Sequence, residues 1–218
     1  MSHNVAIDGP AGAGKSTIAK RIARSLGYIY VDTGAMYRAM AYYLIQNQVD
    51  AADKEAIAAA CQHADISICY QDGEQVVLLN GENVNAYLRT ESVGNMASVS
   101  SVVPEVRKKL VELQQKLARE TDVVMDGRDI GTVVLPDADV KVYLTASVET
   151  RAKRRFLELQ EKGESADLAK IAADIEDRDY RDMHRDISPL RQAEDATLVD
   201  SSDMTIDQVV ERILELCR

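Results

Sequence analysis

The sequence predicts an α/β fold in which a parallel sheet flanked by helices carries a small antiparallel β insert and a helical lid. Two observations predict the sheet and its helices. Short apolar, β-branched runs alternate with longer segments whose apolar residues recur at helical spacing. A glycine-rich turn, residues 9–16 with the sequence GPAGAGKS, joins the first run to the first helical segment.

The first part of the chain alternates strands with helices. Ile18, Ile22 and Leu26 recur at helical spacing directly after the glycine-rich turn. Because helices separate the strands, we expect the strands to be parallel and covered on both faces. The expected elements are a strand over 4–8, a helix over 14–26, a strand over 28–31, and helices over about 34–47 and 52–63.

The stretch from about 65 to 84 interrupts this alternation. Its apolar runs are separated by two pairs, Asp72-Gly73 and Asn80-Gly81, that favour tight hairpin turns. We therefore expect a small antiparallel insert at this place in the chain.

The rest of the chain returns to helices and parallel strands. Pro104 suits the first turn of a helix, and Gly163 is the only strong interruption in the charged segment over 147–185. The expected elements are helices over about 86–101 and 104–120, strands over 123–125 and 140–144, helices within 147–185, a strand over 197–199 and an amphipathic helix from about 205.

Length and composition favour one domain that acts in the cytoplasm. The chain has 218 residues, of which 46% are hydrophobic, enough for one sizeable core. Its formal net charge of -10 argues against a nucleic acid polymer as partner, because such partners usually meet a broadly basic face. The sequence has no apolar run of about 18 residues and no signal-peptide pattern, so we expect no membrane association. The acidic surface favours a monomer.

The glycine-rich turn has the composition of a phosphate-binding loop. Glycine permits positive φ angles, which turn backbone N–H groups toward phosphate oxygens at a helix N-terminus. Lys15 would pair with the β- and γ-phosphates of ATP, and the Ser16 hydroxyl would bind Mg²⁺. A purely structural glycine turn is the alternative, but the strand before it and the helix after it favour a P-loop NTPase-type core. The expected ATP-binding residues are Gly9, Pro10, Ala11, Gly12, Ala13, Gly14, Lys15, Ser16 and Thr17.

This loop alone does not separate kinases from GTPases or motor ATPases. The Asn-Lys-x-Asp segment typical of guanine recognition is absent from the sequence. Dense arginine over 148–158 and 179–185 suits phosphoryl transfer onto a small anionic acceptor instead.

Two segments that follow strands are candidates for the acceptor site. Within 32–38, DTGAMYR, Thr33 could cap a helix, with Tyr37 and Arg38 in its first turns; a plain cap, a core aromatic and a solvated charge are the alternative. Residues 126–129, DGRD, place two carboxylates and a guanidinium at the end of a strand, where ligands collect in open α/β sheets. A turn of solvated charges would have the same composition.

Two arginine clusters are the remaining candidates. Arg178, Asp182 and Arg185 share one face of a predicted helix, and Arg181 adds further positive charge there. This excess favours a phosphate ligand, although an exposed ladder of ion pairs would have the same spacing. A second basic helical edge could close over ATP or simply be solvated, and it comprises Arg151, Arg154 and Arg155.

Four separated segments together resemble the bacterial cytidylate kinase family. They are residues 9–17 (GPAGAGKST), 32–38 (DTGAMYR), 126–134 (DGRDIGTVV) and 178–182 (RDYRD), and they span nearly the whole chain. The resemblance implies transfer of the γ-phosphate of ATP to CMP or dCMP, with Mg²⁺ as cofactor. It also implies a single domain over 1–218, with a core (about 1–62, 104–146 and 186–218), a CMP-binding insert (about 63–103) and a lid (about 147–185).

The resemblance also implies roles for single residues. Ser98, Arg107 and Asp129 would read the cytosine edge, and Arg178 and Asp182 would hold the ribose. The groups around the acceptor phosphate would be Tyr37, Arg38, Arg128 and Arg185. The catalytic groups would be Lys15, Arg128, Arg154 and Arg185, and Asp126 would orient Mg²⁺ through water or structure its loop. Thr33 keeps the hydroxyl of the serine that relatives often carry.

Three alternatives stay open at this point. A kinase of the same fold could use another acceptor, such as UMP, shikimate or dephospho-coenzyme A. A nucleotide-binding regulator would carry the same loop without catalysis, and an interaction protein would use it only as a structural turn.

Overall fold

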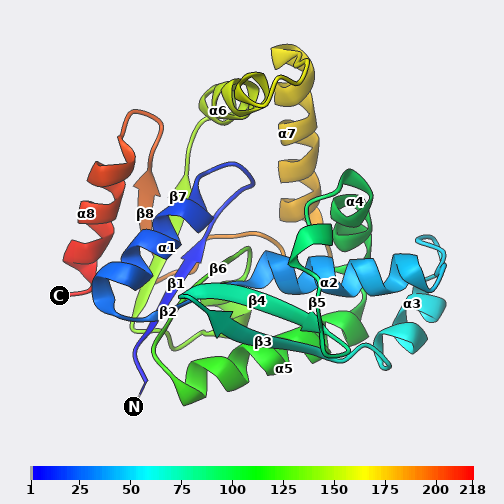
Figure 1. The fold of residues 1–218 in the computed structure, drawn as a ribbon. Coiled ribbons are helices and arrows are strands. Elements are labelled where there is room, and N and C mark those ends of the chain that lie inside the picture. Colours follow the sequence, from blue (N-terminus) through cyan, green and yellow to red (C-terminus); the bar gives the residue numbers. More distant parts are fainter. Residues whose placement is uncertain (1) are drawn as a thin grey trace. The chain divides into compact units, whose positions relative to one another are not determined.

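The computed structural model describes residues 2–218, which form two compact units (Figure 1). The first unit comprises the chain up to Tyr30 together with Thr121–Arg218, and the second comprises Val31–Glu120. Residues 31–62 and 104–120 therefore cluster with the antiparallel insert, whereas the resemblance implied that they belong to the core. The division into core, insert and lid remains a prediction.

The first unit is built on a sheet with the strand order β2-β6-β1-β7-β8. The pairings of β1 with β6, β1 with β7 and β7 with β8 are all parallel, which confirms the predicted α/β class. The strands are β1 (Asn4–Asp8), β2 (Ile29–Asp32), β6 (Val123–Gly127), β7 (Val140–Thr145) and β8 (Thr197–Asp200).

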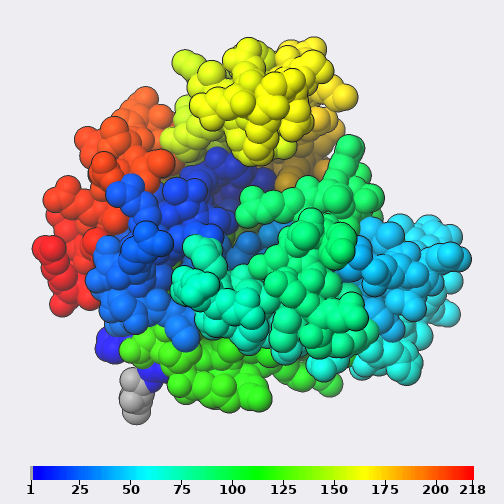
Figure 2. All heavy atoms as spheres, viewed as in Figure 1, coloured from blue at the N-terminus to red at the C-terminus, as the bar shows by residue number. Residues whose placement is uncertain are grey.

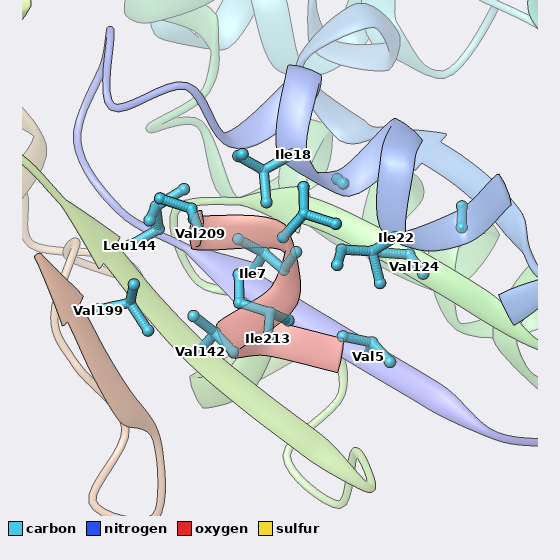
Figure 3. Close-up of a cluster of buried hydrophobic side chains, with 13 residues drawn as sticks. Val5, Ile7, Ile18, Ile22, Val124, Val142, Leu144, Val199, Val209 and Ile213 are labelled. Carbon is cyan, nitrogen blue, oxygen red and sulfur yellow. The ribbon is translucent and has the colours of Figure 1, made fainter. Parts of the chain in front are cut away.

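Two helices cover this sheet with apolar side chains. Ile22 of α1 (Lys15–Leu26) and Ile213 of α8 (Ile206–Leu216) are fully buried, and they join Val5 and Ile7 of β1 in one core cluster (Figure 3). Figure 2 shows the same neighbourhood from outside, with the red C-terminal segment beside the blue N-terminal one. The isoleucine side chains that recur at helical spacing in α1 thus face the sheet, as the sequence predicted.

Two further helices and one irregular turn complete the first unit. The charged segment forms α6 (Val148–Glu161) and α7 (Leu168–His184), with Gly163 between them at a left-handed φ of 73°. After β6 the chain makes a π-helical turn over Ile130–Val134, for which the sequence has no predictive pattern. None of the helices in the described part of the chain is long and apolar enough to span a bilayer.

The second unit combines four helices with the predicted antiparallel insert. The insert is a three-stranded sheet in the order β3-β4-β5. Asp72-Gly73 and Asn80-Gly81 all have positive φ angles, as the predicted tight turns require. The elements are α2 (Thr33–Gln46), α3 (Lys54–Cys61), β3 (Ile66–Gln71), β4 (Glu74–Leu79), β5 (Glu82–Asn83), a 3-10 turn over Asn85–Tyr87, α4 (Glu91–Ser100) and α5 (Pro104–Glu120).

The core of the second unit lies around α2. Met36, Met40 and Leu44 lie at helical spacing on this helix and are completely buried. Ile57 of α3 and Leu110 of α5 are equally buried, and both helices contact α2. The unit therefore has a hydrophobic core of its own, which holds the start of α2 in place.

Candidate active site

The phosphate loop leaves β1 through a conformation that only glycine tolerates. Gly9 has a φ of 151°, and a Cβ added there would lie 1.9 Å from the carbonyl oxygen of Leu144 in β7. Gly12 and Gly14 also have positive φ angles, and α1 begins directly after them at Lys15. The loop thus turns its backbone toward the N-terminus of α1, the arrangement that binds phosphate.

Lys15 is held inside this loop. Its Nζ donates a hydrogen bond to the carbonyl oxygen of Pro10 at 2.8 Å, and its side chain is buried. Burial, reinforced by the guanidinium of Arg128, lowers the pKa of Lys15 to about 7, although the carboxylates of Asp126 and Asp8 oppose the shift. A phosphate ligand would supply the counter-charge that favours the protonated amine.

Ser16 and Asp126 form the pair that the sequence assigned to the metal. The Ser16 hydroxyl donates to the Asp126 Oδ2 at 3.0 Å, and the Tyr30 hydroxyl donates to the other carboxylate oxygen at 2.8 Å. Among residues 2–218 there is no cluster of three or more acidic, His or Cys side chains that would hold a metal by protein ligands alone. A hydroxyl beside one carboxylate fits Mg²⁺, which keeps several waters and takes the rest of its shell from phosphates.

Asp8 fixes the loop that follows β6. One oxygen of its buried carboxylate accepts from the N–H of Ile130 at 2.8 Å, and the other accepts from the N–H of Gly131 at 2.7 Å. Burial raises the pKa of Asp8 to about 6 despite these two hydrogen bonds. The carboxylate therefore sets the position of the segment that carries Arg128 and Asp129.

Arg128 is oriented by a carboxylate of α7. Its Nε donates to the Asp182 Oδ2 at 2.9 Å, in a pair that is largely shielded from solvent. Burial alone would raise the pKa of Asp182, but Arg128 together with the nearby guanidiniums of Arg178 and Arg185 holds this pKa below its ordinary value. Arg128 and Asp182, to which the resemblance gave roles at the acceptor phosphate and the ribose, are thus in direct contact, and those roles remain predictions.

Arg185 lies beside Asp129, at 3.9 Å from its carboxylate. The expectation that Arg185 continues the helix of Arg178 and Asp182 is wrong, because α7 ends at His184 and Arg185 is its extended C-cap. Its Nε instead donates to the carbonyl oxygen of Ser188 at 2.6 Å. The turn that reverses the chain after α7, and not helical spacing, therefore directs Arg185.

The basic edge of α6 divides into two different environments. Arg154 directs its guanidinium to the loop after β8, where Nη2 donates to the Ser201 carbonyl oxygen at 2.7 Å. Its predicted role over the transferring phosphate remains a prediction. Arg151 is neither solvated nor open to ATP, because it is only 4% exposed and pairs with Asp179 of α7 at 2.6 Å. Arg155 is about half exposed and pairs with Glu158.

In the second unit, α2 is capped by Asp32 and not by Thr33. The Asp32 carboxylate accepts from the N–H of Ala35 at 2.8 Å, and Thr33 is the buried first residue of the helix. Aspartate and threonine are both good N-cap residues. Here the helix begins at Thr33, so Asp32 is the residue in the N-cap position. The second Asp32 oxygen pairs with Arg38 at 3.1 Å. Within the described chain, the buried Arg38 Nε is without a hydrogen-bond partner.

The other predicted residues of the second unit lie near α2 and α4. The Arg107 guanidinium lies over the Tyr37 ring, 5.5 Å from its centroid, and is almost completely buried. Its Nη1 also donates to the Ser101 carbonyl oxygen at 3.2 Å. Ser98 is half-buried on α4, and its carbonyl oxygen accepts from the Ser101 hydroxyl. Tyr37, Arg107 and Ser98 thus belong to one region of this unit.

A protein-family model described as cytidylate kinase matches residues 5–218. The chain belongs to the cytidylate kinase family. A cytidylate kinase from Lactobacillus johnsonii is 54% identical over 212 residues, which cover 97% of this chain and 92% of that protein. One from Caldicellulosiruptor saccharolyticus is 52% identical over 213 residues, covering 98% of this chain and 94% of that protein. The solved structure of TT1252 from Thermus thermophilus shares the fold at a TM-score of 0.50 and 18% identity, over 99% of this chain and 96% of its own.

Membership in the cytidylate kinase family accounts for the four segments that the sequence singled out, but the structure adds residues that sequence reasoning missed. Asp8 holds the backbone that follows Asp129, Tyr30 holds the Asp126 carboxylate, and Asp179 holds the Arg151 guanidinium. Asp8 could have been found by the rule that selected Asp126, because both are acidic residues near the end of a buried strand. No local pattern marks Tyr30, and Asp179 lies within the segment 178–182 but was given no role there.

Proposed function

We propose that this protein transfers the γ-phosphate of MgATP to CMP or dCMP, giving ADP and the corresponding diphosphate. The observation that carries the proposal is the match to the cytidylate kinase family over residues 5–218. The phosphate loop supports it, because Gly9 opens the loop and Lys15 lies buried within it. Transfer requires no covalent intermediate: a phosphate oxygen of the acceptor bonds to the γ-phosphorus as the bond to the ADP oxygen breaks.

On the donor side, we assign charge neutralisation to Lys15 and metal binding to Ser16. Ser16, with Asp126 beside it, would hold Mg²⁺, which would neutralise part of the negative charge of the phosphates. The Ser16 hydroxyl is the protein ligand, and Asp126 would orient that hydroxyl or a metal-bound water, since it accepts a hydrogen bond from Ser16. Tyr30 holds the Asp126 carboxylate from its other side.

On the acceptor side, we assign base reading to Asp129 with Ser98 and Arg107. A carboxylate accepts from the exocyclic amine of cytosine, which uracil lacks, so Asp129 would discriminate against UMP. The buried carboxylate of Asp129 lies 3.9 Å from the guanidinium of Arg185. Asp182 and Arg178 would hold the ribose.

The acceptor phosphate is assigned to arginines and one tyrosine. Arg38 supports this assignment. Its Nη2 is held by the Asp32 carboxylate, and among the described residues its Nε–H has no hydrogen-bond acceptor, so it could donate to a phosphate oxygen. Arg128 and Arg185 are likewise oriented by Asp182 and the Ser188 carbonyl. Held guanidiniums of this kind stabilise transferring charge without reorganising. Tyr37 and Thr33 complete the set, and Arg154 would approach the transferring group on closure of the lid.

A coupled assay of ADP formation tests the proposal. MgATP is supplied with CMP, dCMP, UMP, AMP or no acceptor. We expect strong stimulation by CMP and dCMP and weak stimulation by UMP. Equal use of UMP would refute the base-reading assignment, and absence of stimulation by any nucleotide would refute the proposed reaction.

Two further predictions are that the protein is a monomer and that it acts in the cytoplasm. Size-exclusion chromatography tests the first, and cell fractionation tests the second.

A further inference from the structure

Arg151 is a buried guanidinium with partners in three segments of the first unit. Its Nε donates to the Ala146 carbonyl oxygen at 2.9 Å, just after β7. Its Nη1 donates to the Ala11 carbonyl oxygen at 3.1 Å, in the phosphate loop. Both terminal nitrogens donate to Asp179 of α7, at 3.1 and 2.6 Å. One side chain therefore links the phosphate loop to α7.

The two segments that Arg151 links hold opposite sides of the proposed reaction. Ala11 lies in the loop assigned to the donor phosphates. Asp179 is the neighbour of Arg178 and lies one turn before Asp182, the two α7 residues assigned to the acceptor. Asp182 in turn orients Arg128 at 2.9 Å. A shift of α7 against the phosphate loop would therefore displace acceptor-binding groups relative to the donor.

The buried pair of Arg151 and Asp179 is better explained by a role in positioning than by a contribution to the free energy of unfolding. A buried ion pair contributes little net stability, because removing both charges from water offsets most of their attraction. Arginine is required here by its planar fork, which makes two parallel bonds to a carboxylate and leaves donors for two carbonyls. The phosphate loop also packs directly on this side chain, since a Cβ added at Gly12 would lie 3.5 Å from the Arg151 Cβ.

We propose that Arg151 and Asp179 are positioning residues, which fix α7 to the phosphate loop so that acceptor and donor groups are held in register for transfer. The proposal rests on the proposed phosphoryl transfer. It assigns neither residue a contact with substrate. Loss of the link should therefore lower turnover more than it weakens the binding of either substrate, because misplacement by about 1 Å can cost about a hundredfold in rate.

The experiment compares three single variants of the full chain, and the double variant of Arg151→Lys with Asp179→Asn, with the wild type. Asp179→Asn removes the charge and keeps the shape, and Arg151→Lys keeps the charge but loses the fork. Glu158→Gln is the matched control, because Glu158 lies on α6 like Arg151 and accepts from Arg155 at 2.9 Å in an exposed pair. Steady-state kcat and KM for ATP and CMP, ATP hydrolysis without acceptor, and thermal unfolding are measured for each, with kinetics well below the unfolding temperature.

We expect Asp179→Asn and Arg151→Lys to lower kcat with CMP about tenfold or more, with both KM values changed less than about threefold. Hydrolysis of ATP without acceptor should fall much less, because it does not require the α7 groups. The double variant should lose no more than the worse single one, since both substitutions break one link. Glu158→Gln should stay within about twofold of the wild type.

The inference is overturned if the two substitutions match Glu158→Gln, if they raise KM without lowering kcat, or if their effects on kcat multiply. It is also overturned if transfer and acceptor-independent hydrolysis fall together, which would indicate general loss of structure. A wild type that fails to phosphorylate CMP would refute the proposed function itself, so the two failures are distinguishable.

Discussion

Replacing Gly9 by alanine tests the closest backbone approach in the phosphate loop. The added Cβ would lie 1.9 Å from the Leu144 carbonyl oxygen, whereas contacts below 3.0 Å are essentially never found. The loop or β7 must therefore move by about 1.1 Å, the difference between these distances. A positive φ unfavourable to alanine adds about 1–3 kcal/mol of strain. Together with the displaced packing, we expect the free energy of unfolding to fall by about 2–5 kcal/mol.

The same displacement should lower kcat about a hundredfold, because the loop that positions the phosphates moves by about 1 Å. Gly27→Ala is the control: Gly27 also has a positive φ, of 73°, but nothing lies within 4 Å of an added Cβ. Urea denaturation should show a loss of only about 1–2 kcal/mol for the control, and the coupled assay should show nearly unchanged kcat. If Gly9→Ala resembles Gly27→Ala in both measurements, the clash is relieved without moving the loop and the reasoning fails.

Four further predictions concern single side chains. Lys15→Ala should abolish transfer in the coupled assay while circular dichroism stays unchanged, and near-normal turnover would overturn the role of Lys15. Asp129→Ala should impair use of CMP far more than binding of ATP; equal loss of both in titration and kinetics would remove Asp129 from the base site. Ile213→Ala should lower the free energy of unfolding by about 2–5 kcal/mol in urea, and a loss below about 1 kcal/mol would contradict its complete burial. Because burial raises the pKa of Asp8 from 3.8 to about 6, its contribution to stability is fully present below about pH 4 and lost as the pH rises through about 6. Urea unfolding between pH 4 and 7 should show this loss in the wild type and not in Asp8→Asn, so parallel curves would refute it.

Local patterns in the sequence predicted most of the fold. The alternation of apolar runs with helical segments placed every strand of the parallel sheet, and the Asp72-Gly73 and Asn80-Gly81 pairs placed both turns of the insert. Each of these signals depends on residues that are close in the chain. The π-helical turn over Ile130–Val134 could not be predicted from local patterns. Its first N–H groups donate to the carboxylate of Asp8, which is distant in the chain.

The candidate site was predictable where residue type alone indicates chemistry. The glycines and Lys15 of the phosphate loop are of this kind: the glycines have the positive φ angles that the pattern requires and Lys15 is buried in the loop, while their binding of phosphate remains a prediction. Helix ends were less predictable, since Asp32 and Thr33 compete for the same cap, and α7 ends one residue before Arg185. The pairing of Arg151 with Asp179 joins two helices, and spacing along either helix says nothing about it.

The order of the strands in the parallel sheet also constrains how the chain folds during its synthesis. Asn4 of β1 pairs with Val123 of β6, so the central strand leaves the ribosome long before either of its neighbours exists. Val31–Glu120, by contrast, is an uninterrupted stretch with its own core. Domains generally fold as units during synthesis, and closing a long loop before its contacts form is slow. The inserted stretch can therefore be complete while the nucleotide-binding sheet is still being translated, and β1 must avoid aggregation during that interval.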